Sequence, residues 1–227
     1  MRQDLKFAWL VSSKEIPTKI ENWIVKAYEK NRKIFGRVPS KKFKIIICNS
    51  EKEWKKESKY YYFPFGAGTV LRNGTFVAKE QKFLKRNDKN YKILLDHEVN
   101  HVFFALIYGI TKPLWVHEGL ANFVGGYHLS INEILRNIKQ KGLNHKVLQY
   151  RYLNKNFPNK ETVILNYSIW KYFIEFISDN KTKVIIRFMN DYIKNPTETN
   201  YDKLFLMHFG KNQRDKFIDF IKWLKKY

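Results

Sequence analysis

The segment LLDHEVNHVFF, residues 94–104, places two histidines and a glutamate where they could act together. If the segment is helical, His97 and His101 lie about 40° apart on one face, one turn above the other. Two imidazole nitrogens arranged in this way can reach one tetrahedral zinc ion. Glu98 lies beside that face, near enough to take a proton from a metal-activated water without being a ligand itself. This geometry is the physical basis of the H-E-x-x-H motif.

The same segment has a simpler interpretation, in which the two histidines are core side chains bonded to backbone groups or carboxylates. The motif alone leaves both interpretations open, and a third ligand would favour the metal. Cys48 is the only cysteine, so neither a Cys-rich zinc site nor an internal disulfide can form. A metzincin site is excluded as well, because Phe104 and Ile107 occupy the positions of the glycine and histidine that would have to follow His101.

A third ligand is available in KPLWVHEGLANFVGG, residues 112–126. Glu118 follows His101 by 17 residues, enough to finish one helix, turn between Gly109 and Pro113, and return on a second, antiparallel helix. His117 is a competing ligand, but on a helix it points about 100° away from Glu118. Small residues would let the second helix pack closely: Gly119, Ala121, Gly125 and Gly126.

HEVNH followed by PLWVHEGLANFV resembles the gluzincin metallopeptidases, and most of all the small bacterial "peptidase MA-like" families. In those proteins a W-x-x-E-G-x-A helix follows H-E-x-x-H, and its glutamate is the third zinc ligand. The resemblance therefore implies that His97, His101 and Glu118 hold Zn²⁺ and that Glu98 is the general base.

The resemblance extends to three further features. Asn122 matches the position that orients the first histidine, where many gluzincins carry a carboxylate, and an amide is a weaker orienter. NYSIWKYFIEFISDN (166–180) is similar to a later helix that opens with a tyrosine bonding the transition state, which implies this role for Tyr167. The alternative for Tyr167 is an aromatic packed in an aromatic-rich helix. The segment 67–79 would correspond to the edge strand that aligns a peptide substrate.

The elements expected around this cluster are mixed before residue 88 and helical after it. Helical spacing follows Pro17 and ends at Gly36. Apolar residues alternate in KFKIIICNS (42–50), which predicts a strand, and Ser50 could cap a short helix after it. The segment 67–79 is typical of a hairpin with Arg-Asn-Gly at its turn. Further helices are expected near 93–107, 116–127, 130–140, 164–178, 182–194 and 214–225.

These elements predict an α+β fold in a single domain, residues 1–227, and the resemblance implies that this fold is zincin-like. A mixed α/β lobe (1–88) would precede a helical lobe (89–227), with the active-site helix between them. The length suits one domain, and a hydrophobic content of 44% supplies a core and argues against disorder.

The net charge of +22 allows an anionic surface or polymer as a partner. The lysines are scattered and no nucleic-acid-binding signature accompanies them, so no nucleic-acid partner is expected. KRNDK (85–89) is typical of a turn and not of an arginine-rich arm. Composition carries no information on oligomeric state.

The expected function is zinc-dependent hydrolysis of a peptide or protein substrate. Two alternatives stay open: a catalytically silent zincin-fold binding protein, and a basic binder of nucleic acid or an anionic surface. The apolar stretch of the amino-terminal MRQDLKFAWLVSS is too short for a signal peptide, and an acidic residue interrupts its basic region. No window of the sequence is apolar over the length that a membrane span needs. The chain as given is therefore expected to be cytoplasmic; a secreted or anchored protein whose leader had been removed would look the same.

Overall fold

The computed structural model describes residues 1–227 except 60–65, 110–111, 127, 150–158, 179–181 and 227. The chain divides into two compact units. Unit 1 comprises Met1–Ile110 with Val124–Gly126, and unit 2 comprises Thr111–Phe123 with Tyr127–Tyr227. The boundary falls after the H-E-x-x-H helix, so that helix belongs to the unit that contains the sheet.

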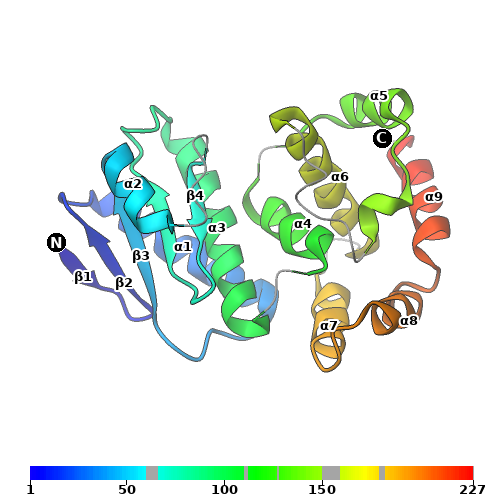
Figure 1. The fold of residues 1–227 in the computed structure, drawn as a ribbon, viewed down its shortest axis with the longest axis horizontal. Coiled ribbons are helices and arrows are strands. Elements are labelled where there is room, and N and C mark those ends of the chain that lie inside the picture. The colour runs from blue at the N-terminus through cyan, green and yellow to red at the C-terminus, as the bar shows by residue number, and fades with distance from the viewer. Residues whose placement is uncertain (60–65, 110–111, 127, 150–158, 179–181, 227) are drawn as a thin grey trace. The chain divides into compact units, whose positions relative to one another are not determined.

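Unit 1 is built on a five-stranded sheet of order β1-β2-β3-β5-β4 (Figure 1). The strands are β1 (Arg2–Asp4), β2 (Ala8–Ser12), β3 (Phe43–Cys48), β4 (Gly68–Val70) and β5 (Phe76–Lys79). β2, β3 and β5 pair in parallel, whereas β1 and β4 add antiparallel edges. The predicted strand and hairpin are confirmed. β1 and β2, which the sequence does not predict, lie within residues 1–13.

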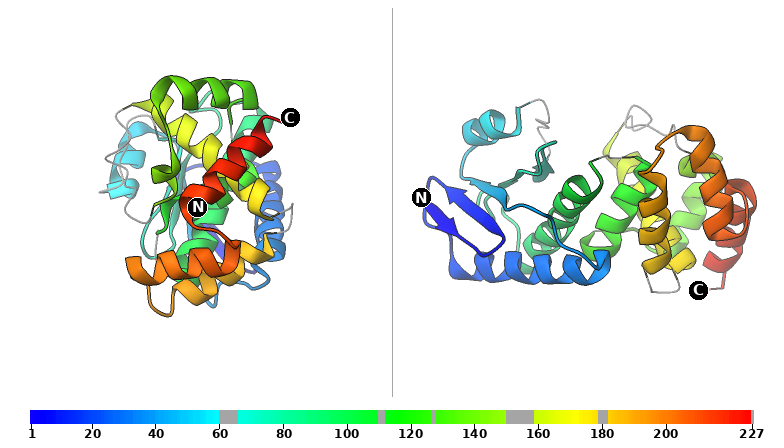
Figure 2. Two further views of the ribbon diagram at one scale, coloured as in Figure 1. Left: turned by 90° about the vertical axis from the view of Figure 1, so that its right-hand side faces the viewer. Right: turned by 90° about the horizontal axis from the view of Figure 1, so that it is seen from below.

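Three helices accompany this sheet: α1 (Thr18–Phe35), α2 (Glu51–Ser58) and α3 (Asp88–Tyr108). α1 and α2 lie on opposite faces of the sheet (Figure 2). α1 ends at Gly36, which adopts the left-handed conformation (φ 66°), and Ser50 caps α2 by accepting a hydrogen bond from the Glu53 N–H at 3.2 Å. Both predicted helix boundaries are confirmed.

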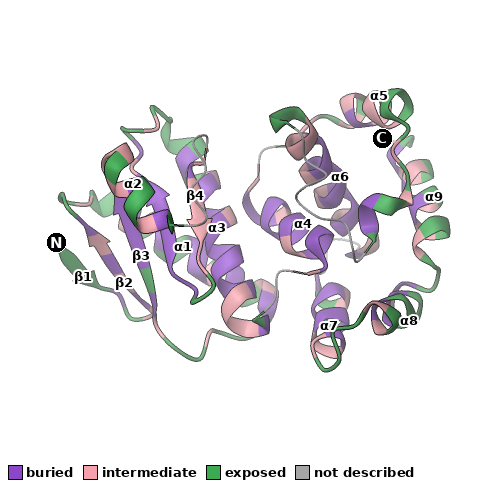
Figure 3. Cartoon of the chain, viewed as in Figure 1, coloured by how far each residue is buried: buried purple, intermediate pink, exposed green. Residues whose placement is uncertain are grey.

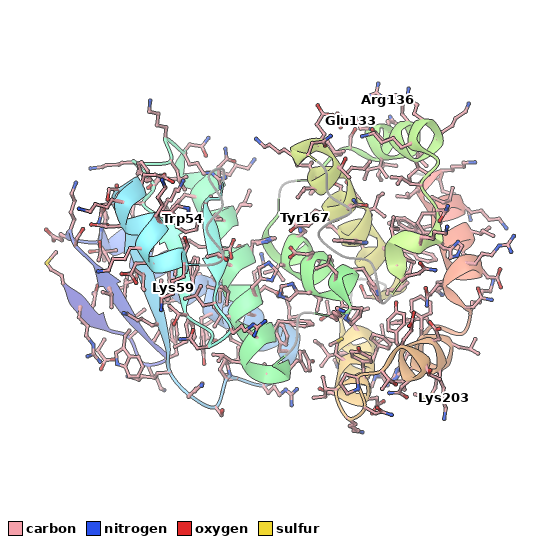
Figure 4. The ribbon with its side chains drawn as sticks, in the orientation of Figure 1. Trp54, Lys59, Glu133, Arg136, Tyr167 and Lys203 are labelled. Atoms are coloured by element: carbon pink, nitrogen blue, oxygen red, sulfur yellow. The ribbon has the colours of Figure 1, made fainter. Side chains whose placement is uncertain are left out.

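Alternation along β3 decides which core each side chain joins. Ile46 and Cys48 pack with Val77 of β5 against Trp54, a fully buried residue of α2 (Figure 4). Because successive strand residues point to opposite faces, Ile45 and Ile47 are buried on the other face. The sheet is therefore covered on both sides.

Unit 2 is helical. Its elements are α4 (Leu114–Gly125), α5 (Ile131–Lys141), the short 3-10 helix η2 (His145–Leu148), α6 (Lys160–Ser178), α7 (Lys183–Tyr192), α8 (Glu198–Phe209) and α9 (Gln213–Leu224). The last turn of α4 is grouped with unit 1. α4 is largely buried, whereas α5 is mostly half-buried or exposed (Figure 3).

The structure confirms the mixed α+β class. The predicted helices match α3, α4, α5, α6, α7 and α9, whereas α8 was not predicted. The apolar run 204–207 in α8 does not follow helical spacing. Two of its residues, Leu206 and Met207, are exposed and do not belong to the buried face of the helix. Among the described residues, no helix is both long and apolar enough to cross a membrane.

Candidate metal centre

α3 is an uninterrupted helix from Asp88 to Tyr108, and this continuity sets the geometry of the two histidines. Asn87 caps its start by accepting from the Asn90 N–H at 2.9 Å, and Gly109 ends it in the left-handed conformation (φ 69°). His97 and His101 lie one turn apart with their rings nearly perpendicular, and their Nε2 atoms are 3.0 Å apart. Ligand nitrogens on a tetrahedral zinc lie roughly 3.3 Å apart, since each Zn–N bond is about 2.0–2.1 Å. The pair is thus close to the spacing that a shared ion requires.

Buried contacts on its other side fix the rotation of α3 about its axis. Phe103 packs against Tyr28 and Phe35 of α1, with ring centroids 5.1 and 5.5 Å apart. Asn100, between the two histidines in sequence, donates its amide to Asn31 Oδ1 at 2.7 Å, also on α1. A buried hydrogen bond specifies one orientation, because slipping it would leave polar groups unpaired. The histidine face therefore points away from α1.

The third member of the cluster is Glu118 of α4, a buried residue with 8% exposure. One ligand atom each from His97, His101 and Glu118 lie within 4.8 Å of one another. Two imidazole nitrogens and a carboxylate oxygen form a donor set that suits catalytic zinc. By donor chemistry and spacing these residues could hold a metal ion.

The last turn of α4 is held against α3 beside His97. A Cβ on Gly125 would lie 2.2 Å from the Asp96 Cβ and 3.1 Å from the His97 backbone nitrogen, so this close approach requires a glycine. Lys30 of α1 donates to the backbone carbonyl of Val124 and, at 3.2 Å, to the Asp96 carboxylate. Lys30 thus binds a free carbonyl at the carboxyl end of α4, where the helix dipole favours a cation.

His117, the competing ligand, is not in the three-residue group that could hold a metal. Its Nδ1 lies 3.4 Å from Glu118 Oε1, which places it beside the third candidate ligand.

Glu98 is buried, with 6% exposure, and its side chain extends toward β4. A Cβ on Gly68 of that strand would lie 2.7 Å from Glu98 Cγ. Arg86 is close enough to interact electrostatically with Glu98. Desolvation lowers the pKa of the Arg86 guanidinium, and the negative charge of Glu98 opposes that shift. The carboxylate therefore lies in a confined environment next to a cation.

Two weaker assignments lie in unit 2. Asn122 is buried and donates its amide to the Glu118 backbone carbonyl at 2.8 Å, so its N–H group is engaged within its own helix. Tyr167 is half-buried on α6, where its ring lies 5.9 Å from that of Trp170 (Figure 4). The roles expected of both residues stay predictions.

Comparison with protein-family models finds no match, and comparison with curated protein sequences finds no significant similarity. The function must therefore be argued from the residues themselves.

Two residues that contact this part of the structure are hard to find from the sequence. Gly68 and Lys30 act through contacts with segments far along the chain, and neither belongs to HEVNH or PLWVHEGLANFV. Only the glycine offered a hint, because glycine weakens the interior of a strand.

Proposed function

We propose that this protein is a zinc-dependent peptidase with a zincin-like fold. The observation that carries the proposal is the proximity of His97, His101 and Glu118, whose ligand atoms lie within 4.8 Å of one another. The resemblance of HEVNH and PLWVHEGLANFV to gluzincin motifs adds support, and so does the burial of Glu98 next to these residues.

His97, His101 and Glu118 would hold the ion. When bound, zinc would act as a Lewis acid and lower the pKa of a coordinated water toward about 7.

Glu98 would act as the general base. Its carboxylate would take a proton from the attacking water and then deliver it to the leaving amine. Tyr167 would donate a hydrogen bond from its phenolic hydroxyl to the developing oxyanion. Peptides or proteins are the substrates, and the site chemistry gives no sequence preference.

Two variants test the proposal. The purified protein is expected to contain one zinc per chain and His101→Ala to lose it. Glu98→Gln keeps the shape and burial of the side chain but cannot accept a proton, so zinc should stay while hydrolysis of a broad peptide library collapses.

Absence of zinc from protein purified without chelator, and failure to take it up on dialysis, would reject the metal site. Equal rates for Glu98→Gln and the wild type would reject the mechanism. Zinc binding without hydrolysis in either protein would instead establish the catalytically silent alternative.

A further inference from the structure

We propose that Gly68 is a positioning residue for Glu98: the absence of a side chain at this point of β4 creates the space in which the Glu98 carboxylate is held. The contact stands on geometry alone. Its consequence for turnover rests on the proposed function.

The steric observation is direct. A Cβ on Gly68 would lie 2.7 Å from Cγ, 2.9 Å from Cδ and 2.9 Å from Oε1 of Glu98. Real Cβ atoms essentially never make non-bonded contacts this short, so an alanine at this position would displace either the strand or the Glu98 side chain.

Backbone conformation does not explain the glycine. Gly68 is absent from the glycines with positive φ, and it pairs with Ala78 of β5 as an ordinary strand residue. Gly74 provides the contrast, because it crowds Leu106 but also has a φ of 81° in the hairpin turn. Glycine inside a strand costs stability, and the backbone conformation at position 68 would accept any residue. The reason for a glycine here is therefore steric.

The backbones of both elements are held in place. β4 is hydrogen-bonded to β5 as an antiparallel strand and packs beside α3. Glu98 is buried, and the Asn100–Asn31 hydrogen bond fixes the rotation of its helix. A methyl group at position 68 would therefore act mainly on the flexible end of the Glu98 side chain, which is the carboxylate. Misplacing a catalytic group by about 1 Å can cost roughly 100-fold in rate.

The first test is kinetic. Gly68→Ala is expected to lower kcat by about tenfold to 100-fold, with KM and zinc content close to wild type. Gly36→Ala is the control, because a Cβ there would meet no atom within 4 Å and only the positive φ makes the substitution unfavourable. It should lower stability and leave kcat within about twofold. A Gly68→Ala protein that keeps full kcat would overturn the proposal, since a merely structural glycine predicts lost stability with normal turnover.

The second test does not require activity. It is a double-mutant cycle on the melting temperature, with Gly68→Ala introduced into the wild type and into Glu98→Ala. The Glu98→Ala variant lacks Cγ, Cδ and Oε1, so the alanine at 68 should lower Tm in the wild type and have little effect in that background.

Equal Tm losses in both backgrounds would overturn the proposal, whatever the enzyme activity. Coupling between the two sites without hydrolysis in any variant would support the positioning contact and reject the peptidase function, so the two failures are distinguishable.

Discussion

The indole N–H of Trp115 donates a hydrogen bond to the hydroxyl of Tyr201 at 2.8 Å, and that hydroxyl donates in turn to the backbone carbonyl of Leu148. All three residues are buried. Trp115 lies in the first turn of α4, and Glu118 follows it by one turn. Tyr201, which belongs to the unpredicted helix α8, therefore anchors the start of the helix that carries the third candidate ligand.

Replacing Tyr201 with Phe should lower the free energy of unfolding by about 1–3 kcal/mol, because the buried Trp115 N–H loses its acceptor. Zinc affinity should fall as well, since Glu118 lies on the loosened helix. Urea denaturation and a competitive zinc titration measure the two effects. Tyr172→Phe is the control: its hydroxyl contacts the exposed His128 at 3.2 Å, so the loss should stay below about 1 kcal/mol. Equal losses in the two variants would contradict the anchoring role.

Glu118→Ala should weaken zinc binding by more than the roughly 10–100-fold that follows loss of a residue supporting a ligand. His117→Ala should cost less, because that ring lies beside Glu118 and outside the candidate ligand group. Metal affinity is linked to folding, so zinc should raise the Tm of the wild type and of His117→Ala but hardly that of Glu118→Ala. Undiminished zinc in Glu118→Ala, with loss in His117→Ala, would make His117 the third ligand.

Tyr167→Phe removes one hydroxyl and leaves the ring on Trp170 in place. If the phenol donates to the oxyanion, turnover should fall by about 10²–10³, or roughly 2.7–4 kcal/mol, with zinc content and Tm nearly unchanged. A change within about threefold is too small for one lost oxyanion donor, and the role would then pass to another tyrosine or to His208.

Cys48 should be protected from thiol reagents in the folded protein. Burial raises the pKa of its thiol to about 12, helped by the charges of Glu53 and Glu57 and opposed by Lys79. The unfolded chain releases this proton near pH 8.5, so above that pH the folded state binds more protons than the unfolded state. Cys48 therefore makes stability fall as pH rises from about 8.5 to 12, and Cys48→Ala should reduce that slope.

Reaction with a disulfide reagent at pH 9 measures the same protection. The folded protein should react at least about 100-fold more slowly than the urea-unfolded chain, because the thiolate is the nucleophile. A fast reaction of the folded protein would contradict the burial.

The sequence by itself determined the features that depend on neighbouring residues. The four-residue spacing of His97 and His101 needs only a helix, and apolar residues on both sides of it supplied one. Ser50 and Gly36 mark helix ends because capping is a local interaction between a side chain or backbone and the adjacent turn.

Only the tertiary structure decided what surrounds those residues. The Trp115–Tyr201 bond joins positions 86 residues apart, and Lys30 reaches a carbonyl 94 residues away. Gly68 meets Glu98 only because β4 pairs at the edge of the sheet that packs beside α3. Local periodicity gives each segment a buried face, but it does not say which distant face will cover it. Long-range packing makes that choice, and with it fixes the surroundings of the histidines and the glutamates.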